Sequence, residues 1–194
     1  MEKKKTAILL ELAEENDGYV SVSQAKDFGI AQTYLSSASE EGLFARISKG
    51  LYLKRGYARD PFYELFFQYH KVVFSLRSAL YLHGLTDEES LEANLPLNYL
   101  TKGIPDIPCR HVGAKEYGLG QALVITPRGN MVNSYDLERT MIDLLRQHER
   151  FSKEEFLFLW RKGKEKSPYV EKLRDYAEAF HVEGELSLLM RLLD

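Results

Sequence analysis

The stretch SVSQAKDFGIAQTYLSSASEEGLFARISKGLYLK, residues 21–54, decides the fold of the N-terminal part of the chain. It begins with Ser21 and Gln24, which have the spacing of a capping box, where each side chain satisfies a free amide at a helix start. A short helix is predicted there, ending at Gly29, because glycine tolerates the left-handed conformation of a helix end. Its apolar residues are expected to face inward; they are Val22, Ala25 and Phe28.

A second helix is predicted from about Ala31 to Glu41, followed by Gly42. Its apolar face holds Tyr34, Leu35 and Ala38, and its polar face holds Gln32, Thr33, Ser36 and Ser37. Two short alternating segments, FARIS and LYLKR, then flank Lys49-Gly50, a pair typical of a hairpin turn. Two short helices followed by a basic hairpin give the order of a winged helix-turn-helix, so DNA binding is the leading hypothesis.

The candidate DNA contacts lie on the second helix and on the hairpin, or wing. Glutamine can pair with adenine, and serine or threonine can reach base edges or phosphates, whereas wing cations lie against phosphates or in the minor groove. The alternative is a solvated helix face beside a hairpin with ordinary surface charges. The candidate residues are Gln32, Thr33, Ser36, Ser37, Arg46, Ser48, Lys49, Lys54 and Arg55.

Charge predicts modest affinity for DNA. The net charge is −3, and residues 1–57 hold eight Lys/Arg and eight Asp/Glu, whereas residues 58–194 hold 18 and 21. The N-terminal part is therefore neutral overall, although its wing gathers cations. Binding through phosphate neutralisation should be weak and sensitive to salt.

The sequence predicts a soluble cytoplasmic protein. No apolar run is long enough to span a membrane, and the charged start MEKKKTAILLELAEEN suits an amphipathic helix better than a signal peptide. Cys109 is the one cysteine, so neither a disulfide framework nor a cysteine-based metal cluster is expected.

The predicted architecture is α+β with two domains. Residues 1–57 form the winged helix-turn-helix, and residues 58–194 form a mixed domain with a small antiparallel sheet, expected between about 95 and 134, and several helices. Asp60-Pro61 should start an aromatic helix after the boundary. The basic run of residues 161–166 is interpreted as a solvated loop between helices, with a second contact to DNA as the alternative.

Signatures of catalysis are mostly missing. GAKEYGLG has two glycines at P-loop spacing but lacks the following Lys-Ser/Thr, and the five histidines are scattered without metal-ligand spacing. The many acidic residues could be assembled by the fold into a nuclease-like carboxylate cluster, for example with Asp106, Glu116 and Lys115, yet nothing in their spacing distinguishes them. We therefore expect no enzyme, no catalytic residue, no metal site and no cofactor.

Several segments together resemble the AbiEi antitoxins, the winged-helix regulators of bicistronic abortive-infection systems. They are ISKGLYLKRG, FSLRSALYLHGLTDE and YDLERTMIDLLRQ, and the resemblance covers about residues 20–147. It implies that the N-terminal domain binds inverted repeats in its own promoter and represses the operon. It also implies that the C-terminal domain antagonises a nucleotidyltransferase-type toxin, AbiEii, in a phage-defence system of type IV, without a stable complex.

The resemblance places the DNA contacts on the same helix face and wing, and makes the apolar residues of SALYLHGLTDE and YDLERTMIDLL packing residues. Copies of the chain are expected to associate on paired half-sites. Two other functions stay open: a winged helix that targets a metal-dependent nuclease, and an adaptor whose winged helix binds protein. The sequence leaves undetermined the operator, the toxin's substrate, the neutralising residues and the oligomeric state of the free protein.

Overall fold

The computed structural model describes residues 2–100, 103–104, 106–166 and 169–193. The chain forms two compact units. The N-terminal unit extends to His70 and includes Ile125–Met131, and the C-terminal unit holds Lys71–Val124 and the chain from Val132 onward. The predicted domain boundary near residue 57 stays a prediction, because the division into compact units does not test where an independently folding domain ends.

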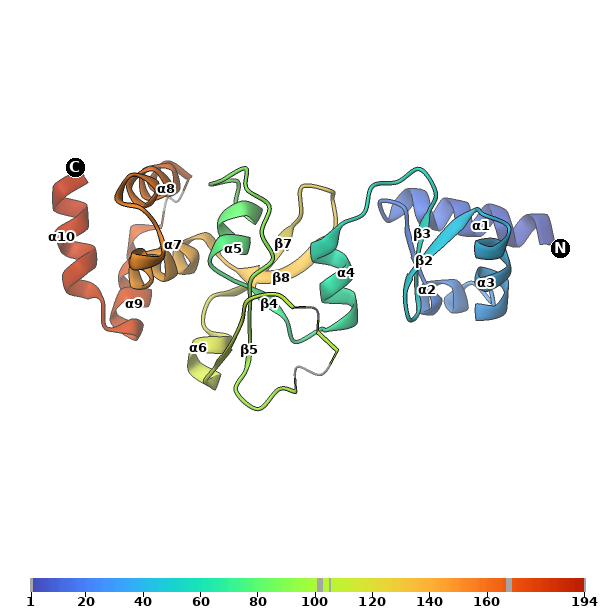
Figure 1. Cartoon of the computed structure of the whole chain (residues 1–194), viewed down its shortest axis with the longest axis horizontal. Helices are drawn as coiled ribbons and strands as arrows, with labels where there is room; N and C mark the ends of the chain where they lie inside the picture. Colours follow the sequence, from blue (N-terminus) through green and yellow to red (C-terminus); the bar gives the residue numbers. More distant parts are fainter. Residues whose placement is uncertain (1, 101–102, 105, 167–168, 194) are drawn as a thin grey trace. The chain divides into compact units, whose positions relative to one another are not determined.

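The N-terminal unit contains the two helices and the hairpin expected from residues 21–54. Its elements are α1 (Glu2–Glu15), β1 (Tyr19–Ser21), α2 (Val22–Asp27), α3 (Gln32–Glu40), β2 (Phe44–Ser48), β3 (Leu51–Lys54) and α4 (Pro61–Gln68). The strands form an antiparallel sheet in the order β1-β3-β2 (Figure 1). Strand β1, which the sequence does not predict, pairs Tyr19 with Leu53 and thereby joins the start of α2 to the hairpin.

The local signals around α2 explain its limits. Ser21 Oγ accepts from the Gln24 amide at 3.1 Å, and the Ser21 amide donates to Gln24 Oε1 at 2.9 Å, so the capping box is confirmed. Gly29 ends the turn with φ of 71°. The prediction for Phe28 is wrong: its side chain is 58% exposed, because α2 ends at Asp27 and Phe28 no longer shares the inward face.

An apolar core packs the first three helices of this unit against its sheet. Leu9 of α1 and Leu35 of α3 are fully buried against Phe44 of β2 and Tyr52 of β3. Three helices thus cover the sheet through one cluster, and the polar face of α3 stays outside it.

The C-terminal unit combines a five-stranded sheet with a group of helices. Its elements are β4 (Val73–Phe74), α5 (Arg77–Leu82), β5 (Ala93–Pro96), β6 (Cys109–Val112), α6 (Ala114–Gly118), β7 (Gln121–Ile125), β8 (Met131–Tyr135), α7 (Leu137–Arg146), the 3₁₀ turn η1 (His148–Arg150), α8 (Lys153–Lys166), α9 (Val170–Phe180) and α10 (Glu183–Leu193). The strand order is β6-β5-β4-β8-β7, and α7 to α10 follow one another toward the C-terminus (Figure 1). The broad expectation of an α+β chain is confirmed.

The expected antiparallel sheet is wrong in this unit. Strands β4 and β5 are antiparallel, but β4 pairs with β8 in parallel and β5 pairs with β6 in parallel. A tight turn joins antiparallel neighbours, whereas parallel neighbours need a long connection. The sheet is therefore mixed.

The basic run of residues 161–166 lies within α8, so the expected loop is also wrong. Gly163 gives the reason, since a Cβ at this position would lie 3.0 Å from Met141 Sδ on α7. The glycine allows close packing of two helices here and does not end the helix. In the described part of the chain, no helix has the length and apolar character required to cross a membrane.

Candidate functional site

Helix α3 presents the polar face expected of it, with one exception. Gln32, Thr33 and Ser37 are exposed. Ser36 is half-buried, and its hydroxyl lies 3.3 Å from Tyr52 Oη on β3. Three of the four predicted helix residues therefore present accessible side chains, and the fourth also connects α3 to the sheet.

Polar contacts with α1 and packing in the core fix the orientation of α3. Tyr34 Oη lies 2.8 Å from Thr6 Oγ1 of α1, and Lys5 Nζ lies 5.6 Å from the centre of the Tyr34 ring. Leu35, fully buried, packs into the apolar core against which Tyr34 also lies. Because side chains held by packing and hydrogen bonds keep their geometry, the exposed face is a preorganised surface.

The hairpin exposes two of its predicted cations at the turn. Gly50 adopts φ of 85° after Lys49, and a register shift lies between Arg46 and Ser48. Arg46 and Lys49 are exposed, and Arg46 Nε donates weakly to the Ser48 carbonyl at 3.4 Å. Ser48 Oγ is buried and has no hydrogen-bond partner among the described residues. The cations, and not the Ser48 hydroxyl, are thus accessible to a partner.

The two cations at the end of the hairpin, Lys54 and Arg55, differ in their availability to a partner. Lys54 Nζ donates to the Glu14 carboxylate, and so does the Tyr57 hydroxyl. The hydrogen bond to Glu14 raises the pKa of Lys54, and those from Lys54 and Tyr57 lower the pKa of Glu14. Arg55 is exposed; its backbone amide donates to the Leu43 carbonyl, and its side chain makes no hydrogen bond or ion pair with the described residues. Lys54 is therefore occupied by Glu14 and less available to an external partner. Arg55, in contrast, extends the exposed cationic surface.

The elements that carry this surface also carry a family signature. Residues 7–53 match the family of AbiEi antitoxin transcriptional regulators. The match confirms the resemblance to AbiEi antitoxins that the sequence predicts, and it runs from α1 to β3. No curated protein matches the chain.

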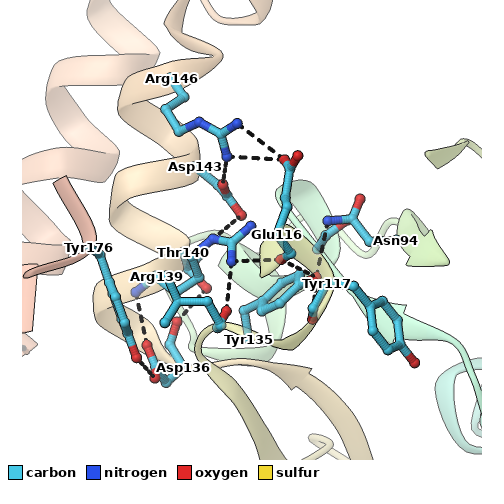
Figure 2. Close-up of polar contacts among 12 residues, drawn as sticks. Asn94, Glu116, Tyr117, Tyr135, Asp136, Arg139, Thr140, Asp143, Arg146 and Tyr176 are labelled. Carbon is cyan, nitrogen blue, oxygen red and sulfur yellow. Dashed lines mark hydrogen bonds and ion pairs between the residues drawn. The ribbon is translucent and has the colours of Figure 1, made fainter. Parts of the chain in front are cut away.

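Beyond the AbiEi match, the C-terminal unit contains a buried polar cluster built on YDLERTMIDLL (Figure 2). The Arg139 side chain has no exposed surface; its Nε donates to Asp143 Oδ2 at 3.0 Å. Arg139 Nη1 donates to the carbonyls of Leu119 and Glu116 at 2.6 and 3.0 Å. Arg146 completes the cluster, donating to Asp143 Oδ1 at 2.9 Å and to Glu116 Oε1 at 3.1 Å. Two cations thus face two carboxylates.

Aromatic rings enclose this cluster. The Arg139 guanidinium lies 4.3 Å from the centre of the Tyr135 ring and 4.2 Å from that of Phe180, and Arg146 also lies 4.2 Å from Phe180. Arg139 Nη2 has no hydrogen-bond partner among the described residues, so the ring faces supply part of its stabilisation. Burial raises the pKa of Tyr135 to about 12, so its hydroxyl stays protonated at neutral pH.

A third carboxylate, that of Asp136, joins α7 to α9. Asp136 caps α7 by accepting from the Arg139 amide at 2.8 Å, and its Oδ2 accepts from the Tyr176 hydroxyl at 2.8 Å (Figure 2). Lys172 Nζ lies 3.0 Å from the same oxygen. Burial, together with the bond to Asp136, raises the pKa of Tyr176 to about 12. Only packing by apolar residues was predicted for this segment, and its polar cluster was missed. Arg139 and Asp143, four residues apart on an apolar helix face, were the available signal.

The structure gives the nuclease-like residues other partners. Glu116 Oε1 lies 3.1 Å from Arg146 and 3.7 Å from Arg110, and Lys115 Nζ donates to the Ala179 carbonyl at 3.2 Å. Asp106 is exposed. Across the described residues, no group of three histidine, cysteine, aspartate or glutamate side chains is placed to hold a metal ion.

His83, in the landmark SALYLHG, should make stability depend on pH. Its Nε2 lies 2.8 Å from the Tyr135 carbonyl, and burial lowers its pKa below the usual 6.5 despite that hydrogen bond. The folded protein therefore favours the neutral ring. The stabilisation is fully present above about pH 6.5 and is lost as the pH falls toward the lowered pKa.

We therefore expect the free energy of unfolding to decrease more between about pH 7.5 and about pH 5.5 in the unmodified protein than in His83→Gln. Fluorescence of Trp160, the single tryptophan and fully buried in the same unit, reports unfolding in urea. Equal pH dependence in the two proteins would show that His83 does not cause the loss of stability at low pH.

Proposed function

We propose that the chain is a cytoplasmic antitoxin that also represses its own operon, with a winged helix-turn-helix over residues 1–57 that binds inverted repeats in the promoter. Helix α3 would enter the major groove and the β2–β3 hairpin would contact phosphate. Residues 58–194 would antagonise a nucleotidyltransferase-type toxin, AbiEii, without a stable complex, in abortive infection against phage. The observation that carries the proposal is the preorganised polar face of α3 beside two exposed cations, in the segment that matches the AbiEi family.

The site residues in this proposal form two groups. Gln32, Thr33 and Ser37 would reach base edges or phosphates from α3, with Ser36 at the side of the helix nearest the sheet. Arg46, Lys49 and Arg55 would provide phosphate contacts. Lys54 and Ser48 would contribute less, because Lys54 pairs with Glu14 and the Ser48 hydroxyl is buried.

The deciding experiment is a titration of the full chain against its own upstream DNA and a scrambled sequence, at two salt concentrations. Selective binding that weakens with salt supports the proposal. Equal affinity for both sequences, or no binding, would contradict it and favour the adaptor function.

Replacing Arg46 and Lys49 together with alanine should flatten the salt dependence of operator binding. Each phosphate that the protein no longer neutralises makes the negative slope of log K against log salt shallower by about 0.9. Lys54→Ala should change the slope less, since that cation is paired within the protein. Lys153→Ala, at an exposed lysine of α8, is the control. An unchanged slope in the double variant would remove the hairpin from the interface.

Substituting Gln32, Thr33 and Ser37 with alanine in the full chain should separate the two activities. Removing a side chain that reads a base costs about 1–3 kcal/mol of discrimination, so a reporter driven by the promoter should lose repression. Protection of cells that express the toxin should persist, because these exposed residues carry no packing. If protection were lost while the protein stayed folded, the proposed division of labour would be wrong.

A further inference from the structure

Helix α8 carries an exposed stripe that the proposed function does not use. Glu154, Phe158, Arg161 and Glu165 are exposed and lie four, three and four residues apart, the spacing of one helix face. Phe158 is 59% exposed at the middle of the stripe. With Leu157 and Lys162 these residues line an open groove of about 660 Å³.

The opposite face of α8 is fully engaged in the core. Leu159 and Trp160 are buried, and Gly163 packs against Met141. The charges of the stripe, in contrast, are unused: the side chains of Glu154, Arg161 and Glu165 make no hydrogen bond or ion pair with the described residues. Lys162 Nζ lies 5.6 Å from the centre of the Phe158 ring. An exposed aromatic side chain with free charges around it is typical of an interaction surface.

Two charges of the stripe, Glu154 and Arg161, are complementary to each other about a two-fold axis. The point midway along α8 between Glu154 and Arg161 is also midway between Leu157 and Phe158. A second α8 placed antiparallel about that point therefore sets Glu154 against Arg161 twice, with the apolar residues between the two ion pairs. In this arrangement Lys153 of one copy would lie at the same height as Lys162 of the other. The two would not face each other, because Lys153 lies about 100° around the helix from Glu154 and therefore off the contact face.

We propose that a second copy of this chain docks on α8, antiparallel to the first, with a two-fold axis between Leu157 and Phe158. Such an interface is isologous, since each copy contributes the same residues. A helix of 14 residues is about 21 Å long, so the contact is small and the dimer is weak. The proposal concerns the free protein and does not depend on DNA binding.

Charge reversal tests the proposal in the full chain without DNA. Sedimentation velocity up to about 1 mM protein should show a dimer that forms with concentration. Glu154→Arg and Arg161→Glu should each weaken it at least about tenfold, because both ion pairs become like-charge contacts. An equimolar mixture of the two single variants should dimerise again, since every Arg then faces a Glu. The double variant should regain self-association for the same reason, and Phe158→Ala should weaken the dimer with all charges retained.

The mixture also controls for folding, because two misfolded variants would not restore association with each other. Unmodified protein that stays monomeric up to about 1 mM would overturn the proposal. So would single variants that dimerise like the unmodified protein, or a mixture that fails to dimerise. None of these results concerns DNA binding, so the proposed function would stand or fall separately.

Discussion

Replacing Arg139 with methionine should lower the free energy of unfolding of the C-terminal unit by about 3–5 kcal/mol, because it leaves a buried carboxylate without its main partner. Asp143 is 2% exposed and forms ion pairs with both Arg139 and Arg146. Burial raises the pKa of Asp143 against the pull of both guanidinium groups. The substitution also frees the Leu119 carbonyl and leaves the Glu116 carbonyl with the Tyr135 hydroxyl at 3.4 Å.

Urea unfolding followed by Trp160 fluorescence measures this effect, since Trp160 lies in the same apolar cluster as α7 and α9. Arg174→Met, at an exposed position of α9, is the matched control and should stay within about 0.5 kcal/mol of the unmodified protein. The double variant Arg139→Met/Asp143→Leu should recover part of the loss, because it removes the buried charges together. A loss of stability below about 1 kcal/mol in Arg139→Met would contradict the prediction. It would mean that water or a rearranged side chain replaces Arg139 as the partner of Asp143.

Local chemistry made the N-terminal unit largely predictable. A capping box, a glycine at the end of α2 and the Lys49-Gly50 turn each act over a few residues, and they set the helices and the hairpin. Phe28 was misplaced because its direction depends on where α2 ends, and a shift of one residue in a helix turns a side chain by about 100°. Burial of Ser36 against Tyr52 likewise depends on a contact across the unit.

The C-terminal unit was less predictable because its decisive features involve distant residues. Gly163 resembles a helix breaker in the sequence, but the nearness of Met141 makes it an interior helix residue. Strand direction between β4 and β8 depends on long connections that carry no local signal. Arg139 obtains its partners from α6, α7 and the loop at Leu119, so its burial could not follow from the spacing of charges alone.

Replacing Asp60 with alanine should destabilise the N-terminal unit by roughly 3 kcal/mol, because a helix cap and charge-assisted hydrogen bonds disappear. Asp60 is fully buried. Its Oδ1 accepts from the amides of Phe62 and Tyr63 at 3.2 Å and caps α4. Its Oδ2 accepts from Thr126 Oγ1 at 2.6 Å and Asn130 Nδ2 at 2.9 Å. One carboxylate thus holds a helix start and a distant loop of the same unit.

The neighbouring bonds indicate how far the effect should spread. The Asp60 amide donates to Tyr19 Oη at 2.7 Å, and the Tyr19 hydroxyl donates to Glu64 Oε1 at 2.8 Å. Because Tyr19 lies in β1, loosening α4 should increase amide hydrogen exchange in β1 and in its partner β3. Asp60→Asn should have a smaller effect, since its amide oxygen can still cap α4, although its amino group cannot accept from Thr126 or Asn130. Asp27→Ala, at an exposed acid of α2, should leave exchange unchanged. If Asp60→Ala behaved like that control, the carboxylate would not join these elements.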